Sequence, residues 1–183
     1  MIERIAEHLV DIDHLPMKGK IADIGCRGFL FTNEMRRRGH TVIPVDIDDL
    51  KESDYHKIAI SDFDGLCGLV KSDDPQGTKI DKLGNGIDCF TLESFSKMFE
   101  VEFWDLIKLD VEGSEFEIIM SLQRAITKQF SIEFHLHTGA YKQHEVDQMT
   151  DKLKALGYSI ASHEYTSQHG SGMNYWSSLF ILK

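Results

Sequence analysis

Cysteines are few and long apolar runs are missing in this sequence, and its N-terminal pattern leads us to expect no secretion signal. Its three cysteines, Cys26, Cys67 and Cys89, are odd in number and widely spaced, which excludes a disulfide framework or paired zinc ligands and leaves free thiols. No N-terminal stretch has the basic, apolar and small-residue order of a secretion signal, and no apolar run could span a membrane. We therefore expect a cytoplasmic protein.

Positive charge is also in short supply. Lys and Arg number 20 against 30 Asp and Glu, which gives a formal net charge of −10. An acidic surface repels phosphate backbones, so no nucleic-acid partner is expected. The 183 residues, 42% of them hydrophobic, suit a single domain over 1–183 with a core of ordinary size.

The glycine pattern GxGxxG of dinucleotide-binding enzymes is missing as well. Asp23 and Ile24 are followed instead by Gly25, Cys26, Arg27 and Gly28, a GxxG spacing that weighs against a nicotinamide or flavin cofactor. Glycines at this point still let the backbone approach a ligand and turn tightly into a helix, and Asp23 could position the loop or face a cation. A turn that serves only to reverse the chain is the alternative.

What the sequence does contain is an alternation of strand and helix patterns. The spacing of Ile2, Ile5, Leu9 and Ile12 predicts an N-terminal helix over 1–15. Alternation of this kind is typical of an α/β fold with a mostly parallel sheet and helices on both faces. The last two strands have no helix between them and should form an antiparallel edge hairpin. Seven strands are predicted, at 20–24, 41–46, 57–61, 104–110, 130–135, 158–162 and 178–182.

Two segments match neither pattern and are candidate substrate loops. Residues 63–90 are rich in glycine, and we predict them to be irregular, with one short strand at most. Residues 163–176 form a polar and aromatic connection that begins at the carboxyl end of a strand, where ligands bind in such sheets. A mobile edge hairpin is the alternative for this second segment. Its candidate contacts are His163, Tyr165, His169, Tyr175 and Trp176.

Acidic residues follow the second and third predicted strands. Asp46, with Ile47 beside it, ends the second strand, where a carboxylate commonly accepts both hydroxyls of a ribose. Asp62 follows Ser61 at the end of the third strand and could accept a hydrogen bond from an adenine amino group. Alternatively, Asp46 caps a helix or is solvated, and Asp62 is an ordinary turn residue that binds no ligand.

The fourth strand carries three alternating charges, Lys108, Asp110 and Glu112. Buried charges are costly unless they are paired or used, and a period of two places all three on one face of an extended strand. A Lys108 salt bridge combined with acidic residues at a helix N-terminus is the alternative. Ser114 and Glu117 then predict a capping box for the next helix.

The fifth strand offers Glu133, His135 and His137, which alternate with apolar residues. A polar face on a central strand again points to a site. Carboxylate and imidazole ligands suit several divalent ions, so a metal is conceivable. Solvated or hydrogen-bonded side chains at a strand end are the simpler interpretation, and we therefore expect no metal ion.

These segments together resemble one family. The run from Ile107 to Glu115, IKLDVEGSE, is similar to the IK-D-EG-E hallmark of FkbM methyltransferases. The resemblance extends from about residue 20 to the C-terminus, and it departs at Phe29, where family members usually have a second glycine. Further matching segments follow in the expected order: Ala59-Ile60-Ser61-Asp62 with Gly65, Thr91-Leu92-Glu93, Ile132-Glu133-Phe134-His135 and Leu156-Gly157-Tyr158.

The resemblance implies a Rossmann-like class I methyltransferase fold. It also implies transfer of a methyl group from S-adenosylmethionine, typically to a hydroxyl, here expected on a small-molecule or sugar acceptor. Asp110, Glu112 and His135 are then the candidate bases, and Lys108 could orient a carboxylate. The predicted cofactor-binding residues are Asp23, Gly25, Cys26, Arg27, Gly28, Asp46, Ile47, Ser61, Asp62 and Asp110. A methyltransferase-fold protein that binds without catalysis and a nucleotide-sugar or nicotinamide enzyme are the alternatives.

Overall fold

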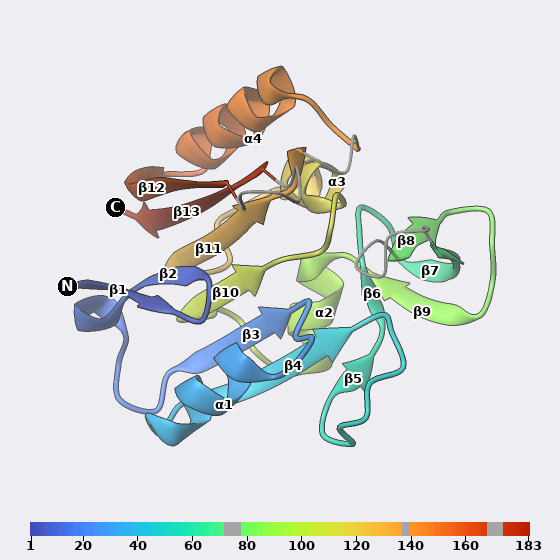
Figure 1. Cartoon of the computed structure of the whole chain (residues 1–183), viewed down its shortest axis with the longest axis horizontal. Coiled ribbons are helices and arrows are strands. Elements are labelled where there is room, and N and C mark those ends of the chain that lie inside the picture. Colours follow the sequence, from blue (N-terminus) through green and yellow to red (C-terminus); the bar gives the residue numbers. More distant parts are fainter. Residues whose placement is uncertain (72–77, 137–139, 168–173) are drawn as a thin grey trace.

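The structure is a computed structural model that describes residues 1–71, 78–136, 140–167 and 174–183. Its centre is a seven-stranded sheet with the strand order β12-β13-β11-β10-β3-β4-β5 (Figure 1). The strands are β3 (Lys20–Ile24), β4 (Thr41–Asp46), β5 (His56–Lys57), β10 (Leu106–Leu109), β11 (Gln129–Phe134), β12 (Tyr158–Ser167) and β13 (Asn174–Leu182).

The strand directions confirm the predicted sheet. Strands β5, β4, β3, β10 and β11 pair in parallel. Strand β13 is antiparallel to both β11 and β12, so β12 runs in the same direction as the central strands. The carboxyl ends of all these parallel strands therefore lie at one edge, where ligands bind in open α/β sheets.

Both faces of the sheet are covered, as predicted, because successive side chains of a strand point to opposite faces. Ile21 of β3 packs on one face against Phe31 and Met35. Its neighbours Ala22 and Ile24 belong to the larger core on the other face. The first of these faces carries α1 (Leu30–Arg37), and the second carries α2 (Leu92–Met98), α3 (Glu115–Ser121) and α4 (Gln143–Ala155).

The predicted N-terminal helix over 1–15 is wrong. The segment forms a β-hairpin of β1 (Ile2–Ile5) and β2 (His8–Asp11), followed by a single 3₁₀ turn. Ala6 adopts a left-handed conformation, with a φ of 52°, in the two-residue turn between the strands. The Gln129 side chain holds this hairpin against β11, because it accepts from Asp11 N and donates to Asp11 O, both at 3.0 Å. Contacts this distant in sequence override a helical spacing of apolar residues.

Residues 63–90 are also more regular than predicted. They contribute three strands to a second sheet with the order β6-β9-β7-β8, which Figure 1 shows beyond the carboxyl ends of β3 and β4. Glycines permit its tight packing: a Cβ on Gly68 would lie 2.9 Å from the Cα of Gly84. Cys67 and Cys89 are buried in its core. The strands are β6 (Ala59–Ile60), β7 (Gly65–Lys71), β8 (Thr78–Asp81) and β9 (Ile87–Phe90).

The predicted loop over 163–176 is wrong at both ends, because β12 continues to Ser167 and β13 begins at Asn174. His163 and Trp176 stack across these two strands with ring centroids 4.5 Å apart. Cross-strand aromatic pairs stabilise a hairpin, which explains why the polar and aromatic segment extends the sheet. His169 lies outside the described residues.

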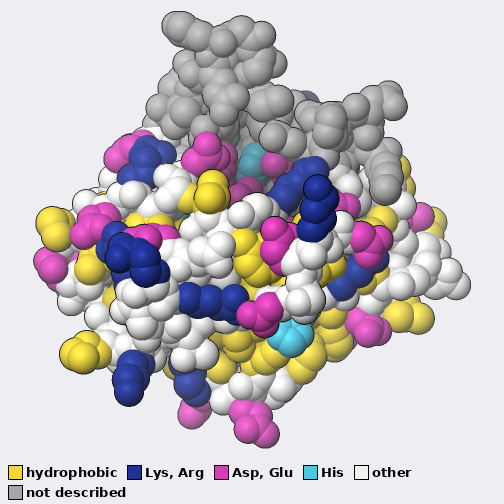
Figure 2. All heavy atoms as spheres, turned by 60° about the horizontal axis from the view of Figure 1, so that its bottom comes forward, with side chains coloured by type: hydrophobic (Ala, Val, Ile, Leu, Met, Phe, Trp, Pro, Cys, Tyr) yellow, Lys and Arg dark blue, Asp and Glu magenta, His cyan; other side chains and the backbone are white. Residues whose placement is uncertain are grey.

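The surface carries charges of both signs. On the face shown in Figure 2, Lys and Arg side chains are interspersed with Asp and Glu. On α1, Glu34 lies 2.7 Å from both Arg37 and Arg38. Within the described ranges, no helix is both long and apolar enough to cross a membrane.

Candidate active site

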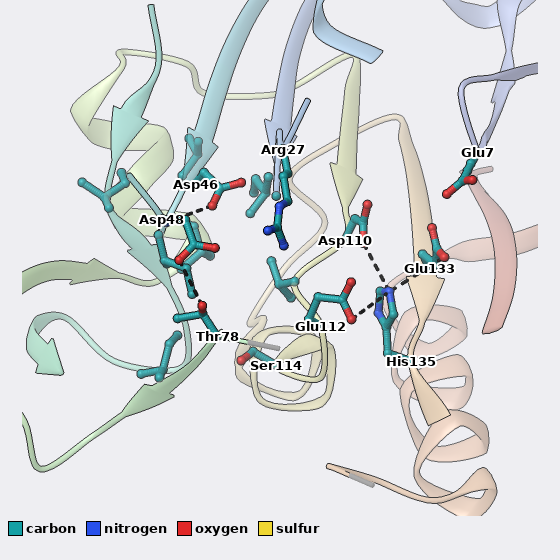
Figure 3. Close-up of a pocket in the computed structure, with 18 residues that line it drawn as sticks. Glu7, Arg27, Asp46, Asp48, Thr78, Asp110, Glu112, Ser114, Glu133 and His135 are labelled. Carbon is teal, nitrogen blue, oxygen red and sulfur yellow. Dashed lines mark hydrogen bonds and ion pairs between the residues drawn. The ribbon is translucent and has the colours of Figure 1, made fainter. Parts of the chain in front are cut away.

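A cavity of about 270 Å³ opens at the carboxyl ends of the central strands (Figure 3). The ends of β3, β4, β10 and β11 form its floor, and β6 and β8 of the second sheet add apolar wall residues. The turn between β1 and β2 contributes Glu7. The misassigned N-terminal segment therefore reaches the site, which the predicted helix could not have shown.

The glycine turn after β3 forms one side of the cavity. Gly25 has a φ of 81°, and a Cβ there would lie 1.7 Å from the carbonyl oxygen of Asp110. Gly28 has a φ of 74° but open space around it, so only its backbone conformation favours glycine. Phe29, the departure from the family pattern, adopts the left-handed conformation with a φ of 57°. The chain therefore keeps the backbone that a second glycine would allow.

Lys108 fixes this turn rather than facing the cavity. Its ammonium donates to the carbonyl oxygen of Gly25 and lies 3.1 Å from Asp23 Oδ1 and 3.2 Å from Asp110 Oδ2. Burial alone would lower the pKa of Lys108, but the charges of the two carboxylates outweigh it and raise the pKa. Asp23 is fully buried and accepts from Thr32 Oγ1 at 2.5 Å. Lys108 and Asp23 thus form a buried salt bridge, which was the alternative interpretation of Lys108 from the sequence.

Acidic residues at the end of β4, the strand next to β3, line the cavity beside the glycine turn. Asp46 is nearly buried, and its Oδ1 accepts from the backbone N–H of Asp48 at 3.0 Å. Burial raises the pKa of Asp46. Thr78 Oγ1 in turn donates to Asp48 Oδ1 at 3.0 Å (Figure 3). Asp48 and Thr78 were not predicted as site residues.

Only some of the predicted cofactor-binding residues line the cavity. Asp62 forms an ion pair with Lys82, at 2.8 Å, and accepts from Ser61 Oγ at 3.1 Å. Cys26 is buried, and burial raises the pKa of its thiol. The cavity brings together Gly25, Arg27, Asp46, Ile47 and Asp110, but not Asp23, Cys26, Gly28, Ser61 or Asp62. The side chain of Arg27 points into it (Figure 3).

Asp110 joins the glycine turn to a group of polar residues at the ends of β10 and β11. Its Oδ2 lies 3.2 Å from Lys108 Nζ and 3.3 Å from His8 Nε2, and its Oδ1 lies 3.3 Å from His135 Nε2. Burial alone would raise the pKa of Asp110, but the charge of Lys108 and hydrogen bonds from His135 and His8 hold it well below its ordinary value. Asp110 is therefore a carboxylate at neutral pH.

His135 is the most connected residue of the site. Its Nδ1 lies 2.8 Å from Glu115 Oε1, and its Nε2 lies 3.6 Å from Glu112 Oε2 and 3.8 Å from Glu133 Oε1. Burial alone would lower the pKa of His135, but the charge of Glu115 and contact with Asp110 raise it well above its ordinary value. In this arrangement the imidazole carries its proton at neutral pH and donates to carboxylates, which disfavours the role of base that we predicted for it. His137 lies outside the described residues.

The turn after β10 depends on Glu115, which sequence reasoning did not single out. Its fully buried carboxylate accepts from the backbone N–H of Val111 at 3.2 Å and of Gly113 at 3.0 Å. The predicted capping box at Ser114 is wrong, because the Ser114 side chain makes no capping hydrogen bond. Glu112 leaves the strand with a φ of 53°, yet its carboxylate faces His135.

Glu133 and His8 complete the group. Glu133 is 4% exposed, and burial together with the negative charge of Asp110 raises its pKa to about 8. His8 is 3% exposed, and burial followed by the charge of Lys108 lowers its pKa. Its Nε2 lies 3.9 Å from Glu133 Oε2. His8 is therefore neutral, and only its place on the hairpin brings it to this site.

Comparison with known proteins gives a family and a fold. The family model described as "Methyltransferase FkbM domain" matches residues 31–160. A comparison with curated proteins gives no significant match. A comparison with solved structures gives further similar proteins.

Three solved methyltransferases share the fold at low sequence identity. The magnesium protoporphyrin IX methyltransferase of Synechocystis PCC 6803, with bound S-adenosylmethionine, is 14% identical with a TM-score of 0.50 over 93% of this chain and 72% of that one. A TehB-like S-adenosylmethionine-dependent methyltransferase of Corynebacterium glutamicum is 14% identical with a TM-score of 0.50, over 93% and 84%. The 1,6-didemethyltoxoflavin-N1-methyltransferase of Burkholderia thailandensis, with S-adenosylhomocysteine, is 12% identical with a TM-score of 0.51, over 90% and 71%.

The family match covers more than two thirds of the chain and includes the turn built by Asp110, Glu112 and Glu115. The strand order and the glycine turn are those expected of a class I methyltransferase. The chain therefore belongs to the FkbM methyltransferase family and is an S-adenosylmethionine-dependent methyltransferase.

Proposed function

We propose that the chain methylates a hydroxyl oxygen of a small molecule or sugar. When bound, S-adenosylmethionine supplies an activated methyl group, so the protein has to align the acceptor and help to remove its proton. Alignment alone can supply roughly 7–11 kcal/mol of the barrier. A positioned base adds about 10²–10⁴-fold.

The residues on the β3 and β4 side of the cavity fit the cofactor. Gly25 has no side chain where one would fill the turn, so its backbone can approach a ligand closely. Asp46 lies at the end of the neighbouring strand, with a carboxylate suited to accept the two hydroxyls of a ribose. Arg27 also lines the cavity and can hold a carboxylate. This division leaves the β10 and β11 side for the acceptor.

The observation that carries the proposal is the group of carboxylates on that second side. Asp110 stays ionised because Lys108 lies 3.2 Å away, and so it can hold an acceptor hydroxyl. Glu112 has a side chain that is 25% exposed and faces the cavity, where it can take the hydroxyl proton. Glu133, with its pKa raised to about 8, can exchange a proton near neutral pH. Deprotonation of a hydroxyl needs such an acceptor close to the oxygen.

A protein that binds S-adenosylmethionine without turnover is the competing function, because a fold does not guarantee activity. The two are separated by incubation with methyl-labelled S-adenosylmethionine and a panel of sugars, polyols and amines. We expect S-adenosylhomocysteine to accumulate together with a product labelled on oxygen, identified by mass spectrometry and NMR. A product labelled on nitrogen would replace the hydroxyl proposal, and cofactor binding with no turnover across the panel would favour the binding protein.

A matched pair of variants tests the assignment of the base. Glu112→Gln removes a carboxylate from the cavity, and we expect turnover to fall about 10²-fold or more while S-adenosylhomocysteine affinity is kept. Asp62→Asn makes the same change of charge at a residue that pairs with Lys82 and does not line the cavity. It should leave turnover unchanged.

A further inference from the structure

We propose that Asp110, Glu112 and His135 bind a divalent metal ion at the acceptor side of the cavity, with Glu133 as a fourth ligand, direct or through water. The four residues are called the carboxylate–histidine cluster below. They come from the ends of two neighbouring parallel strands, β10 and β11, and all of them line the cavity (Figure 3).

The spacing of the side-chain atoms is that of a ligand set. Around His135 Nε2, Asp110 Oδ1 lies at 3.3 Å, Glu112 Oε2 at 3.6 Å and Glu133 Oε1 at 3.8 Å. The ligand atoms of Asp110, Glu112 and His135 all lie within 4.8 Å of one another. Ligands about 2.0–2.2 Å from one ion stand roughly 3–4 Å apart, so an ion can fit with small side-chain adjustments.

Glu133 gives an independent reason to expect a cation. The residue is 4% exposed and lines the cavity, and the ion-pair contacts of its carboxylate within the described ranges are longer than a hydrogen bond. These contacts are to the imidazole nitrogens of His135, at 3.8 Å, and His8, at 3.9 Å. Ionisation of a buried carboxyl group without close donors is costly, and a cation among these oxygens would offset that cost.

The surroundings of His135 orient it as metal-ligating histidines are oriented. Glu115 Oε1 lies 2.8 Å from Nδ1, and Glu115 is itself held by the backbone N–H groups of Val111 and Gly113. A carboxylate on the second ring nitrogen fixes the tautomer and the ring direction of a metal ligand. Nε2 then faces the carboxylates, and an ion bound there takes the place of the Nε2 proton, which is released to solvent.

Asp110 divides its two oxygens between two tasks. Oδ2 faces Lys108 and His8, whereas Oδ1 faces His135. Lys108 therefore supports the glycine turn and leaves Oδ1 for an ion. Three carboxylates and one imidazole, without a cysteine, suit an ion of the Mg²⁺ and Mn²⁺ class, and the imidazole favours Mn²⁺.

The sequence alone favoured the absence of a metal, because polar residues at the end of a strand are commonly solvated. It could not show that Glu133 and His135 are buried or that Asp110 and Glu112 turn toward them. The chemical role of the ion rests on the proposed hydroxyl methylation: it would hold the acceptor oxygen and favour loss of its proton to a carboxylate. Metal binding itself does not rest on that function.

Titration of the protein with MnCl₂, without cofactor or acceptor, tests the site, with free Mn²⁺ followed by electron paramagnetic resonance and heat by calorimetry. We expect one ion per chain at sub-millimolar concentration. Asp110→Asn and Glu112→Gln should each weaken binding at least tenfold. Asp62→Asn, which makes the same change of charge outside the cavity, should bind as the wild type does.

Each contrary result overturns the metal site. Absence of binding to the wild type does so directly. An equal loss in Asp62→Asn and Glu112→Gln would mean diffuse attraction to a chain of net charge −10. Binding of methylammonium in place of Mn²⁺ would mean that the cluster receives a cationic group of the acceptor. If Asp110→Asn does not fold, Glu112→Gln decides, because Asp110 also pairs with the buried Lys108 that holds the glycine turn. None of these measurements needs turnover, so their failure leaves the proposed methylation standing.

Discussion

Glu115 and His135 form a buried pair in which Oε1 of the first lies 2.8 Å from Nδ1 of the second. The same carboxylate accepts from the backbone N–H groups of Val111 and Gly113. One side chain therefore shapes the turn after β10 and orients the imidazole at the end of β11. These two roles give a physical reason why the family hallmark ends in Glu, which is Glu115 here. The sequence comparison had matched this residue without showing what it does.

Replacement of Glu115 by Gln should separate this positioning role from cofactor binding. The amide replaces one acceptor oxygen with a donor that faces a backbone N–H or the imidazole, at a cost of roughly 1–3 kcal/mol in unfolding free energy. We expect turnover to fall at least tenfold while the KM for S-adenosylmethionine changes little. Glu117→Gln, two residues further along the same helix and partly exposed, is the matched control. Equal losses in the two variants would show that Glu115 acts only on the helix.

The glycine turn offers a test with two substitutions of the same size. Both Gly25 and Gly28 have a positive φ, so alanine is strained at either position by about 1–3 kcal/mol. At Gly25 the added Cβ would also lie 1.7 Å from the Asp110 carbonyl oxygen, whereas nothing lies within 4 Å at Gly28. We expect Gly25→Ala to lose several kcal/mol more than Gly28→Ala in urea unfolding, together with cofactor affinity. Similar losses would mean that the turn relaxes easily.

Asp46 and Asp62 were predicted to bind different parts of the cofactor, and the structure separates them. Asp46 lines the cavity, but Asp62 pairs with Lys82 outside it. We expect Asp46→Ala to weaken S-adenosylhomocysteine binding at least tenfold by calorimetry, the scale of one or two hydrogen bonds to a charged group. Asp62→Ala should bind nearly as well as the wild type. The reverse order of effects would return the adenine assignment to Asp62 and remove the ribose assignment from Asp46.

The large sheet could be predicted because its information is local. The alternation of buried strands with amphipathic helices was enough to give its mostly parallel strands and its edge hairpin. The hairpin at the N-terminus could not be predicted in this way, because Gln129 holds it through hydrogen bonds to Asp11. The second sheet was missed for a related reason: Gly68 and Gly84 suggest loops in sequence, yet they let β7 pack closely against the turn that follows β8.

The site shows the same division between local and distant information. The alternation of charges along the fourth predicted strand marked Lys108 and Asp110 as candidate site residues, but it could not show which of them lines the cavity. The contacts of each residue determine its position. Lys108 is buried because it pairs with Asp23 and donates to the Gly25 carbonyl, whereas Asp110 lines the cavity beside His135. The contribution of Glu7 depends on the misassigned hairpin.

Cys89 gives a prediction about stability at alkaline pH. Burial, and then the neighbouring Cys67, raises the pKa of its thiol from 9.0 to about 12. In the unfolded chain the thiol ionises near its ordinary pKa, while the folded protein keeps it protonated. The stability that comes from this difference is fully present below about pH 9 and is lost as the pH rises toward about 12.

Urea unfolding of the wild type and of Cys89→Ala between about pH 8 and about pH 10.5 measures this contribution. The variant should be less stable at the lower pH, because it loses packing in the core of the second sheet. Its stability should nevertheless fall less steeply as the pH rises, by at most about 1.4 kcal/mol per pH unit, the limit for one proton. Parallel curves for the two proteins would show that the Cys89 thiol ionises equally in the folded and unfolded chains.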